Sequence, residues 1–278
     1  ARFGSPLGAS CLQWYRPFQG QLSVSCIFSS FFAYNKSEEK NNYDKKRGVM
    51  TPPRSMIKNQ QQIEGIKKAA VVNNGLLDYI EKNIKIGMST EDIDVLTREY
   101  LKEHNAHSAD LNYEGYPKSI CTSINDVVCH GIPSPNVILK DGDIINVDAA
   151  SELNGYYADA SRMFMLGNVS EEAKKLVKAT KEAMYEGMKA IKPWKSHIGD
   201  IGKAIQRYAH INGYSVVEEF CGHGIGMTMH EDPYVFHFKT KEDTVLIVPG
   251  IMMIGQFIQM MENFLLNGNI LSLLQKMV

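Results

Sequence analysis

Apolar residues recur at helical spacing in four segments of the chain. The first segment begins near Ile57 and ends near Gly87, and its apolar stripe consists of Ile63, Ile66, Ala70 and Leu77. A second helix is predicted to start at Ser89 and Thr90, where small hydroxyl residues precede acidic ones. Two more helices are predicted at 170–191 and 198–212.

Shorter runs with a period near two predict the strands. They lie at 119–124, 143–149, 156–165 and 215–220, and the last leads into a glycine-rich loop. Helices grouped around antiparallel strands are typical of an α+β domain, whereas a parallel sheet would alternate strands and helices along the chain.

An Asn-Gly pair at 154–155 lies between two of the apolar runs, and this pair is a strong signal for a tight hairpin. With these two residues in the turn, Asp148 lies opposite Ser161 and Asp159 lies two residues along the same strand. The two carboxylates then project from one face as diagonal neighbours, about 7–8 Å apart at the backbone. Like charges that are buried together need a cation, so the pair predicts a metal site. Two solvated acids on an exposed hairpin are the alternative.

Composition excludes several classes of protein. The 278 residues are 44% hydrophobic and 22% charged, which is typical of a globular protein, and the net charge of -1 gives no argument for binding nucleic acid or an anionic membrane. The five cysteines form no close pairs, which indicates a reducing compartment, and we expect a cytoplasmic protein. Residues 244–261 carry no charge over 18 positions, but Pro249, Gly250 and two glutamines make them a poor membrane span, and we expect none.

Three histidines lie in segments that suggest chemistry. His130 lies in SINDVVCHGIPS and His230 in MTMHEDP, and a single histidine of this kind is often a core or surface residue. His223 stands between two glycines, which leave an imidazole unobstructed for a metal ion. His237 lies in an apolar stretch and is interpreted as structural or exposed. A site made of aspartates and imidazole favours Mn, Fe, Co or Zn over Ca or Mg. The sequence contains no phosphate-binding loop, dinucleotide fingerprint or HExxH motif.

Five blocks of the sequence together resemble type I methionine aminopeptidases in their order and spacing. The resemblance extends from about Pro52 to Gly250, and its five blocks read YEGYPKSICTSINDVVCHGIPS, DGDIINVDAA, GYYADASRMF, CGHGIGMTMHEDP and LIVPG. The resemblance implies the pita-bread fold, with helices over a curved antiparallel sheet. It also implies a hydrolase that uses two divalent metal ions to remove the initiator methionine when the second residue is small. A creatinase or prolidase relative and a non-catalytic binding protein of the same fold are the alternatives.

The resemblance also implies a role for each matching residue. Asp148, Asp159 and His223 would be metal ligands, with Asp159 bridging the two ions. His230 would stabilise the oxyanion or bind the substrate carbonyl, and His130 would contact the peptide nitrogen of the leaving group. The methionine pocket would be lined by Tyr113, Tyr116, Cys121 and Met229, for which core packing is the alternative. The implied partners are the N-terminal methionine of nascent polypeptides and the ribosome.

The end of the chain departs from this family. We expect residues 1–47 to be an unmatched extension or linker, residues 48–250 to be the catalytic domain and residues 251–278 to be an aberrant tail. The family's two glutamate ligands, from FTIEP and AQ-x-E-H-T segments, are absent, although Glu231 or Glu262 could substitute. With suitable codons the tail reads in another frame as a string containing AQWEHT. Our hypothesis is therefore a deletion with a frameshift that removes the last strands and leaves the chain as written inactive or poorly folded.

Overall fold

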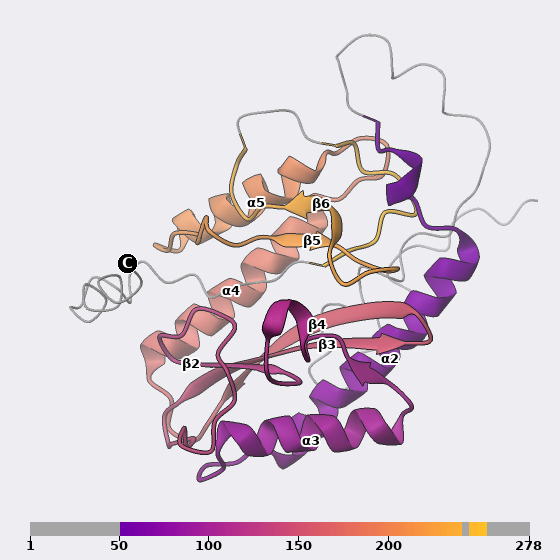
Figure 1. The fold of residues 1–278 in the computed structure, drawn as a ribbon. Helices are drawn as coiled ribbons and strands as arrows, with labels where there is room; N and C mark the ends of the chain where they lie inside the picture. Colours follow the sequence, from indigo (N-terminus) through magenta and orange to yellow (C-terminus); the bar gives the residue numbers. More distant parts are fainter. Residues whose placement is uncertain (1–50, 241–244, 255–278) are drawn as a thin grey trace, which may run out of the picture.

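The computed structural model describes residues 51–240 and 245–254, which contain two helix pairs and two antiparallel sheets (Figure 1). The first half comprises η1 (Arg54–Met56), α2 (Gln60–Asn83), α3 (Thr90–Glu103), β1 (His107–Ser108), η2 (Tyr113–Gly115), β2 (Cys121–Ile124), β3 (Ile144–Leu153) and β4 (Tyr156–Met165). The second half comprises α4 (Glu171–Lys189), α5 (Ile198–Ile211), β5 (Gly222–Gly224), β6 (Glu231–Val235) and β7 (Met253–Ile254).

The predicted hairpin is confirmed residue by residue. Strands β3 and β4 pair over ten positions, with Asp148 opposite Ser161. The turn residues Asn154 and Gly155 have φ angles of 54° and 79°. Positive φ at both positions is what a type I′ turn requires, and this turn matches the twist of the strands that it joins.

Alternation along β3 separates a helix-packed face from a polar face. Ile145, Val147 and Ala149 are buried in one cluster with residues of α2 and α3, and Asn73 of α2 donates to the carbonyl of Ala149 at 2.9 Å. Asp148 has the opposite parity and therefore projects from the other face. Strand β3 is also paired on its second edge, with β2 and then with β1. Asp148 thus projects from a strand that is paired on both sides.

The second half packs α4 against α5 and covers a sheet of short strands in the order β6-β5-β7. The four predicted helices are confirmed, but the predicted strand at 215–220 is wrong, because these residues form no regular structure and none of them is fully buried. The strand lies further on, at β5, where the chain pairs with both β6 and β7. His237 is 3% exposed, which agrees with a structural role.

Several expectations fall on the ends of the chain. The unmatched segment 1–47 and Glu262 lie outside the described residues. Of the predicted tail, the first residues belong to the domain: Ile251 bridges to Ile57, and β7 pairs with β5. The boundary after Gly250 and the loss of later strands remain predictions. No helix in the described part is long and apolar enough to cross a membrane.

Candidate metal centre

The two aspartates of the hairpin meet on the polar face of β3 and β4. Asp159 pairs with Ala150 in register, which places it beside Asp148 along the same face. The Asp159 side chain is 3% exposed, and the two carboxyl groups are hydrogen-bonded to one another. Burial raises the pKa of both groups above the ordinary value, and the nearby acids raise that of Asp159 further. The predicted convergence of the two acids is confirmed.

His223 presents a ring nitrogen to this pair from the second half of the domain. Its Nδ1 lies 2.8 Å from the carbonyl oxygen of Gly224, which fixes the proton on Nδ1 and leaves Nε2 with a lone pair. Nε2 lies 3.8 Å from Oδ2 of Asp159 and has no hydrogen-bond partner among the described residues. Burial lowers the pKa of His223 to about 4, so the ring is neutral at physiological pH. A buried acceptor nitrogen that faces a carboxylate fits a divalent metal ion.

These donors are neighbours rather than a closed cage. Within 51–240 and 245–254, no group of three or more His, Cys, Asp and Glu side chains is arranged so that it could hold a metal ion. Asp148 and Asp159 are instead joined by a hydrogen bond, and a shared proton removes the repulsion between the two acids. The donor set of two carboxylates and one imidazole therefore suits one divalent ion with open positions.

His230 lies next to His223. The two rings have centroids 4.2 Å apart, and Nδ1 of His230 lies 2.9 Å from the hydroxyl oxygen of Tyr113. Burial lowers the pKa of His230, which favours the neutral ring. Met229, the preceding residue, is buried. The structure thus brings together His230, Tyr113 and His223.

His130 approaches the same acids from the loop after β2. It has a left-handed φ of 53°, and its ring lies edge-on to Phe220 with centroids 5.8 Å apart. Burial raises the pKa of Asp148, and His130 is close enough to lower it in part. The three histidines selected from the sequence therefore surround one site.

Tyr116 and Cys121 lie near Asp148 on the β2 side of β3, away from β4. Cys121 pairs with Asp148 in the β2–β3 register and is buried. Burial and the surrounding acids raise the pKa of the Cys121 thiol, so it is neutral and not a nucleophile. The Tyr116 hydroxyl lies within hydrogen-bond distance of the carbonyls of Ile120 and Gly131. A neutral thiol and an aromatic ring form a soft wall, as a thioether pocket requires.

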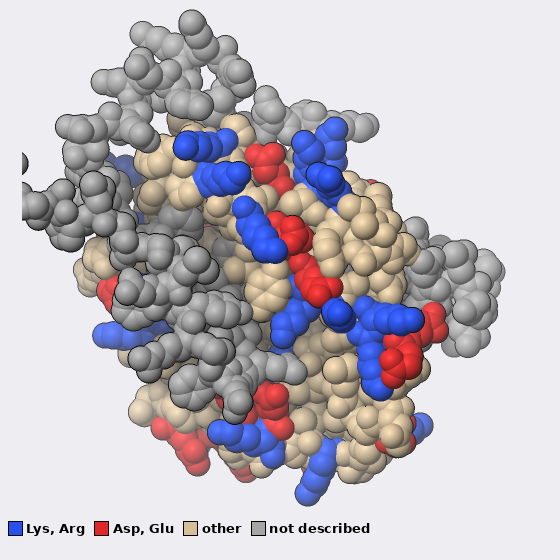
Figure 2. Space-filling view, turned by 180° about the vertical axis from the view of Figure 1, so that it is seen from behind, with Lys and Arg blue, Asp and Glu red and all other residues tan. Residues whose placement is uncertain are grey.

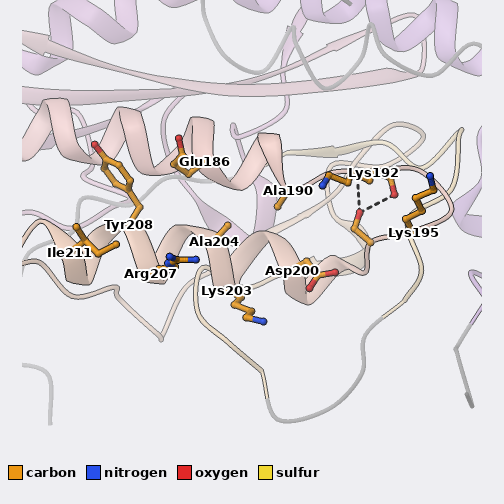
Figure 3. A pocket seen from close by; sticks show the side chains of 11 residues that line it. Glu186, Ala190, Lys192, Lys195, Asp200, Lys203, Ala204, Arg207, Tyr208 and Ile211 are labelled. Atoms are coloured by element: carbon orange, nitrogen blue, oxygen red, sulfur yellow. Dashed lines mark hydrogen bonds between the residues drawn. The ribbon is translucent and has the colours of Figure 1, made fainter.

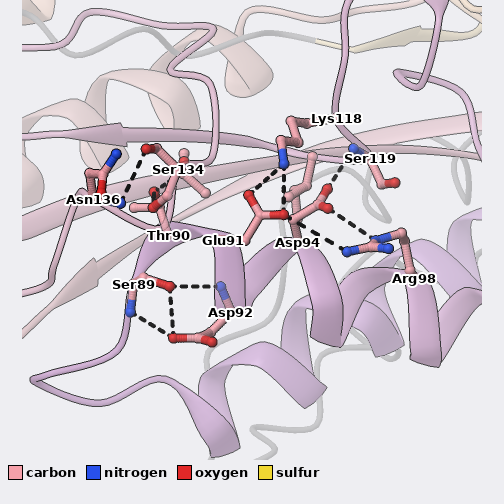
Figure 4. A network of polar contacts seen from close by, with 12 residues as sticks. Ser89, Thr90, Glu91, Asp92, Asp94, Arg98, Lys118, Ser119, Ser134 and Asn136 are labelled. Carbon is pink, nitrogen blue, oxygen red and sulfur yellow. Dashed lines mark hydrogen bonds and ion pairs between the residues drawn. The ribbon is translucent and has the colours of Figure 1, made fainter.

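Helix α3 holds this wall in place through a network of charged groups (Figure 4). The Lys118 ammonium donates to Glu91 at 2.6 Å, and the Ser119 backbone N–H donates to the buried Asp94 at 2.6 Å. Arg98 forms an ion pair with Asp94 at 3.0 Å. Because Lys118 and Ser119 lie between Tyr116 and Cys121 in the sequence, the network fixes the backbone that carries both.

Another buried acid, Asp110, lies near the aspartate pair and was not selected from the sequence. Its Oδ2 accepts the backbone N–H of Ala150 at 3.0 Å, at the point where the edge of β3 passes from β2 to β1. Burial and then the nearby Asp148 raise the pKa of Asp110 well above its ordinary value. No motif marks this residue. It lies in a short irregular segment, and only the pairing of β3 with β1 and β2 explains why it is buried.

The suggestion that Glu231 could replace a missing metal ligand is wrong. Its Oε1 accepts two backbone N–H groups, and its Oε2 is bound by the Lys58 ammonium. Burial raises the pKa of Glu231, but the Lys58 hydrogen bond and the backbone donors together hold it below its ordinary value. Both carboxylate oxygens are therefore committed to the protein.

A groove of about 660 Å³ lies elsewhere, along the outer side of α4 and α5 (Figure 3). Its lining includes Lys192, Lys195, Lys203 and Arg207, together with Glu186 and Asp200, and none of the predicted site residues. The face turned away in Figure 1 shows basic and acidic side chains interspersed rather than separated (Figure 2). The groove is a surface feature unrelated to the aspartate pair.

The chain is similar in sequence to known metallopeptidases. Residues 64–264 match the model of metallopeptidase family M24. The methionine aminopeptidase of Escherichia coli K12 is 41% identical over 196 residues, which cover 70% of this chain and 74% of that protein. Methionine aminopeptidase B of Synechocystis is 42% identical over 214 residues, covering 74% of this chain and 78% of that one.

Solved structures give the same grouping. The methionine aminopeptidase of Rickettsia prowazekii superposes with a TM-score of 0.68 and 39% identity, covering 70% of this chain and 78% of that chain. An X-Pro aminopeptidase from Thermotoga maritima reaches a TM-score of 0.58 at 21% identity, covering 72% and 57%, and so shares the fold. The expected α+β pita-bread fold is confirmed.

Proposed function

The chain belongs to metallopeptidase family M24, among the methionine aminopeptidases, and on that premise we propose that its site removes the N-terminal methionine from new polypeptides. Substrates would be chains whose second residue is small, met in the cytoplasm as they leave the ribosome. The observation that carries the proposal is the meeting of Asp148 and Asp159 with the orphaned Nε2 of His223.

Asp148, Asp159 and His223 would hold the metal. A divalent ion bound there supplies a Lewis acid for the scissile carbonyl and lowers the pKa of water to about 7. The fixed tautomer of His223 keeps Nε2 available without loss of a proton. Three donors support one ion, whereas the second ion implied by the family would need the missing glutamates. Mn, Fe, Co and Zn all suit these donors.

The remaining residues would bind and orient the peptide. His230, held by the Tyr113 hydroxyl, would donate to the substrate carbonyl as negative charge develops on its oxygen. His130 would contact the nitrogen on the leaving side and assist its protonation. Tyr116, Cys121 and Met229 would surround the methionine side chain, since their surfaces are soft and largely apolar.

The test measures methionine released from a Met-Gly-Met peptide by the full chain supplied with Mn²⁺ or Co²⁺. Release that is abolished in Asp159→Asn, and retained in the exposed Asp141→Asn control, supports the proposal. We expect turnover well below that of the Escherichia coli enzyme, because the residues that follow Gly250 depart from the family's FTIEP segment and its glutamate. A chain that binds metal but releases no methionine would reject catalysis. Preference for an Xaa-Pro dipeptide would favour the prolidase alternative.

A further inference from the structure

A lysine and a glutamate from distant parts of the chain form a buried ion pair beneath the loop that carries His230. Lys58 precedes α2, and its side chain is 4% exposed; Glu231 begins β6 and is 16% exposed. The Lys58 ammonium donates to Oε2 of Glu231 across a sequence separation of 173 residues. Neither residue contacts the aspartate pair in the hydrogen bonds of the described residues, so the metal centre does not explain the ion pair.

The Glu231 carboxylate organises the turn that precedes it. Its Oε1 accepts the backbone N–H groups of Met227 at 2.7 Å and Thr228 at 2.9 Å. The Thr228 hydroxyl in turn donates to the carbonyl of His230 at 3.0 Å. The Glu231 carboxylate therefore binds the start of the 227–231 turn, while Glu231 itself forms the end of it. The orientation of this carboxylate thus determines the orientation of the backbone at His230.

Lys58 is itself fixed on several sides. Its backbone N–H donates to the carbonyl of Gly250 at 2.8 Å, in the segment that leads into β7. Gly226 packs against the Lys58 stem so closely that an added Cβ would lie 3.0 Å from the Lys58 Cε and 2.6 Å from Ile66. The ammonium thus has one carboxylate within reach and little freedom to leave it.

We propose that Lys58 is a positioning residue for the reaction: through Glu231 it holds the 227–231 turn so that His230 faces the substrate beside His223. The separation of 4.2 Å between the two rings depends on this turn, since β5 ends before it and β6 begins after His230. The expected effect of Lys58 on turnover rests on the proposed function. Its expected effect on the position of His230 does not, and it can be measured without turnover.

The experiment compares Lys58→Met and Lys58→Arg with Arg162→Met in the full-length chain. Arg162 is a matched control, because it is 6% exposed and ion-paired to Asp78 and Glu81 of α2 on the helix-packed face. The experiment measures amide hydrogen exchange at Met227 and Thr228 and the imidazole ¹⁵N resonances of His230. A general loss of stability would not change these two quantities selectively.

Lys58→Met should speed exchange at both turn amides by about tenfold or more and shift the His230 resonances, because the carboxylate loses its fixed partner. Lys58→Arg should restore both readouts, and Arg162→Met should leave them unchanged. Unchanged amides and ring resonances in Lys58→Met would overturn the proposal. If that variant does not fold, Lys58→Met/Glu231→Gln removes both charges, and an unshifted His230 in this double variant would overturn it equally.

Kinetics separate this inference from the proposed function. If the chain releases methionine, Lys58→Met should lower kcat by about tenfold to a hundredfold with little change in KM, as expected for a misplaced catalytic group. An unchanged kcat beside shifted resonances would overturn the kinetic role. If the unaltered chain releases none, the proposed function fails, and the exchange and resonance readouts still decide whether Lys58 positions His230.

Discussion

The two halves of the domain each place a helix pair against an antiparallel sheet, yet different interactions hold their site residues. In the first half, Asp148 and Asp159 project from strands that pair over ten positions. In the second half, His223 lies in the three-residue strand β5, and His230 lies outside any strand. A ten-position ladder positions the two acids, whereas a three-residue strand positions His223 and side-chain contacts of the following turn position His230. Loss of a side chain should therefore have different consequences in each half.

The largest effect is expected from the acid pair itself. Asp159→Asn keeps the shape of the side chain but removes the charge that a metal ion needs, and Mn²⁺ should bind more than about 100-fold more weakly. Because the ten-position ladder is unaltered, the fold should remain intact by circular dichroism. Titration calorimetry measures the affinity, with Asp141→Asn as the control. Equal Mn²⁺ affinities in the two variants would contradict the assignment.

The second largest effect, a loss of stability, is expected where the strands of the second half are closely packed. Gly224→Ala introduces a methyl group that meets the Asp232 carbonyl on β6, where only a backbone shift could relieve the contact. We expect a loss of about 1–3 kcal/mol in the free energy of unfolding. Gly75→Ala in α2 is the counterpart in the first half, since its methyl group meets only the hydroxyl end of Tyr100. Urea denaturation should show a smaller loss for Gly75→Ala, and the reverse order would refute the comparison.

The third prediction concerns pH. Burial raises the pKa of Asp110, Asp148 and Asp159, so in the metal-free protein their contribution to stability is present below the ordinary value of 3.8 and is lost as pH rises. The His223 pKa is lowered to about 4, so its contribution is present above 6.5 and is lost as pH falls. At the proposed site, Mn²⁺ would bind the ionised acids and the neutral ring. Mn²⁺ should therefore raise Tm more at about pH 8 than at about pH 5.

Thermal unfolding with and without Mn²⁺ at the two pH values measures this difference. Asp159→Asn is the control and should remove most of the pH dependence of the Mn²⁺ effect. An Mn²⁺-induced increase in Tm that is larger at the lower pH would show that the buried acids are not the ligands.

The smallest effects are expected at the helix caps. The Ser170 hydroxyl accepts one N–H at the start of α4, and Ser170→Ala should cost about 0.5–1 kcal/mol. Ser89 forms a reciprocal capping box with Asp92 at the start of α3, so Ser89→Ala should cost more, about 1–2 kcal/mol. Chemical denaturation checks the order. Equal costs would mean that the reciprocal box adds nothing.

The same difference between the halves explains what the sequence could predict. The β3–β4 hairpin has a turn pair and alternating residues that determine its register locally, so its pairing and the meeting of the two acids were predicted correctly. Strand β5 consists of Gly222, His223 and Gly224, whose composition does not favour a strand. Its pairing depends on β6 and on β7, about 30 residues further along the chain. The run at 215–220 is typical of a strand but has no partner strand in the described structure.

Asp110 and Lys58 could not have been predicted for a related reason. Each is a charged residue in an irregular segment, where the ordinary expectation is exposure to solvent. Asp110 is buried because it satisfies a backbone N–H of β3 between two partner strands, and Lys58 is buried because Glu231 lies opposite it. Both environments arise only after distant segments have packed.

The ion pair between Lys58 and Glu231 also affects the order of assembly during synthesis. Residues 58, 231 and 250 must all be available before the turn that carries His230 is closed. The β3–β4 hairpin can form much earlier, because its two strands are adjacent in the chain. A growing chain could therefore expose its acid pair long before His230 is in place, so the order of synthesis itself delays completion of the site until almost all of the described domain has been made.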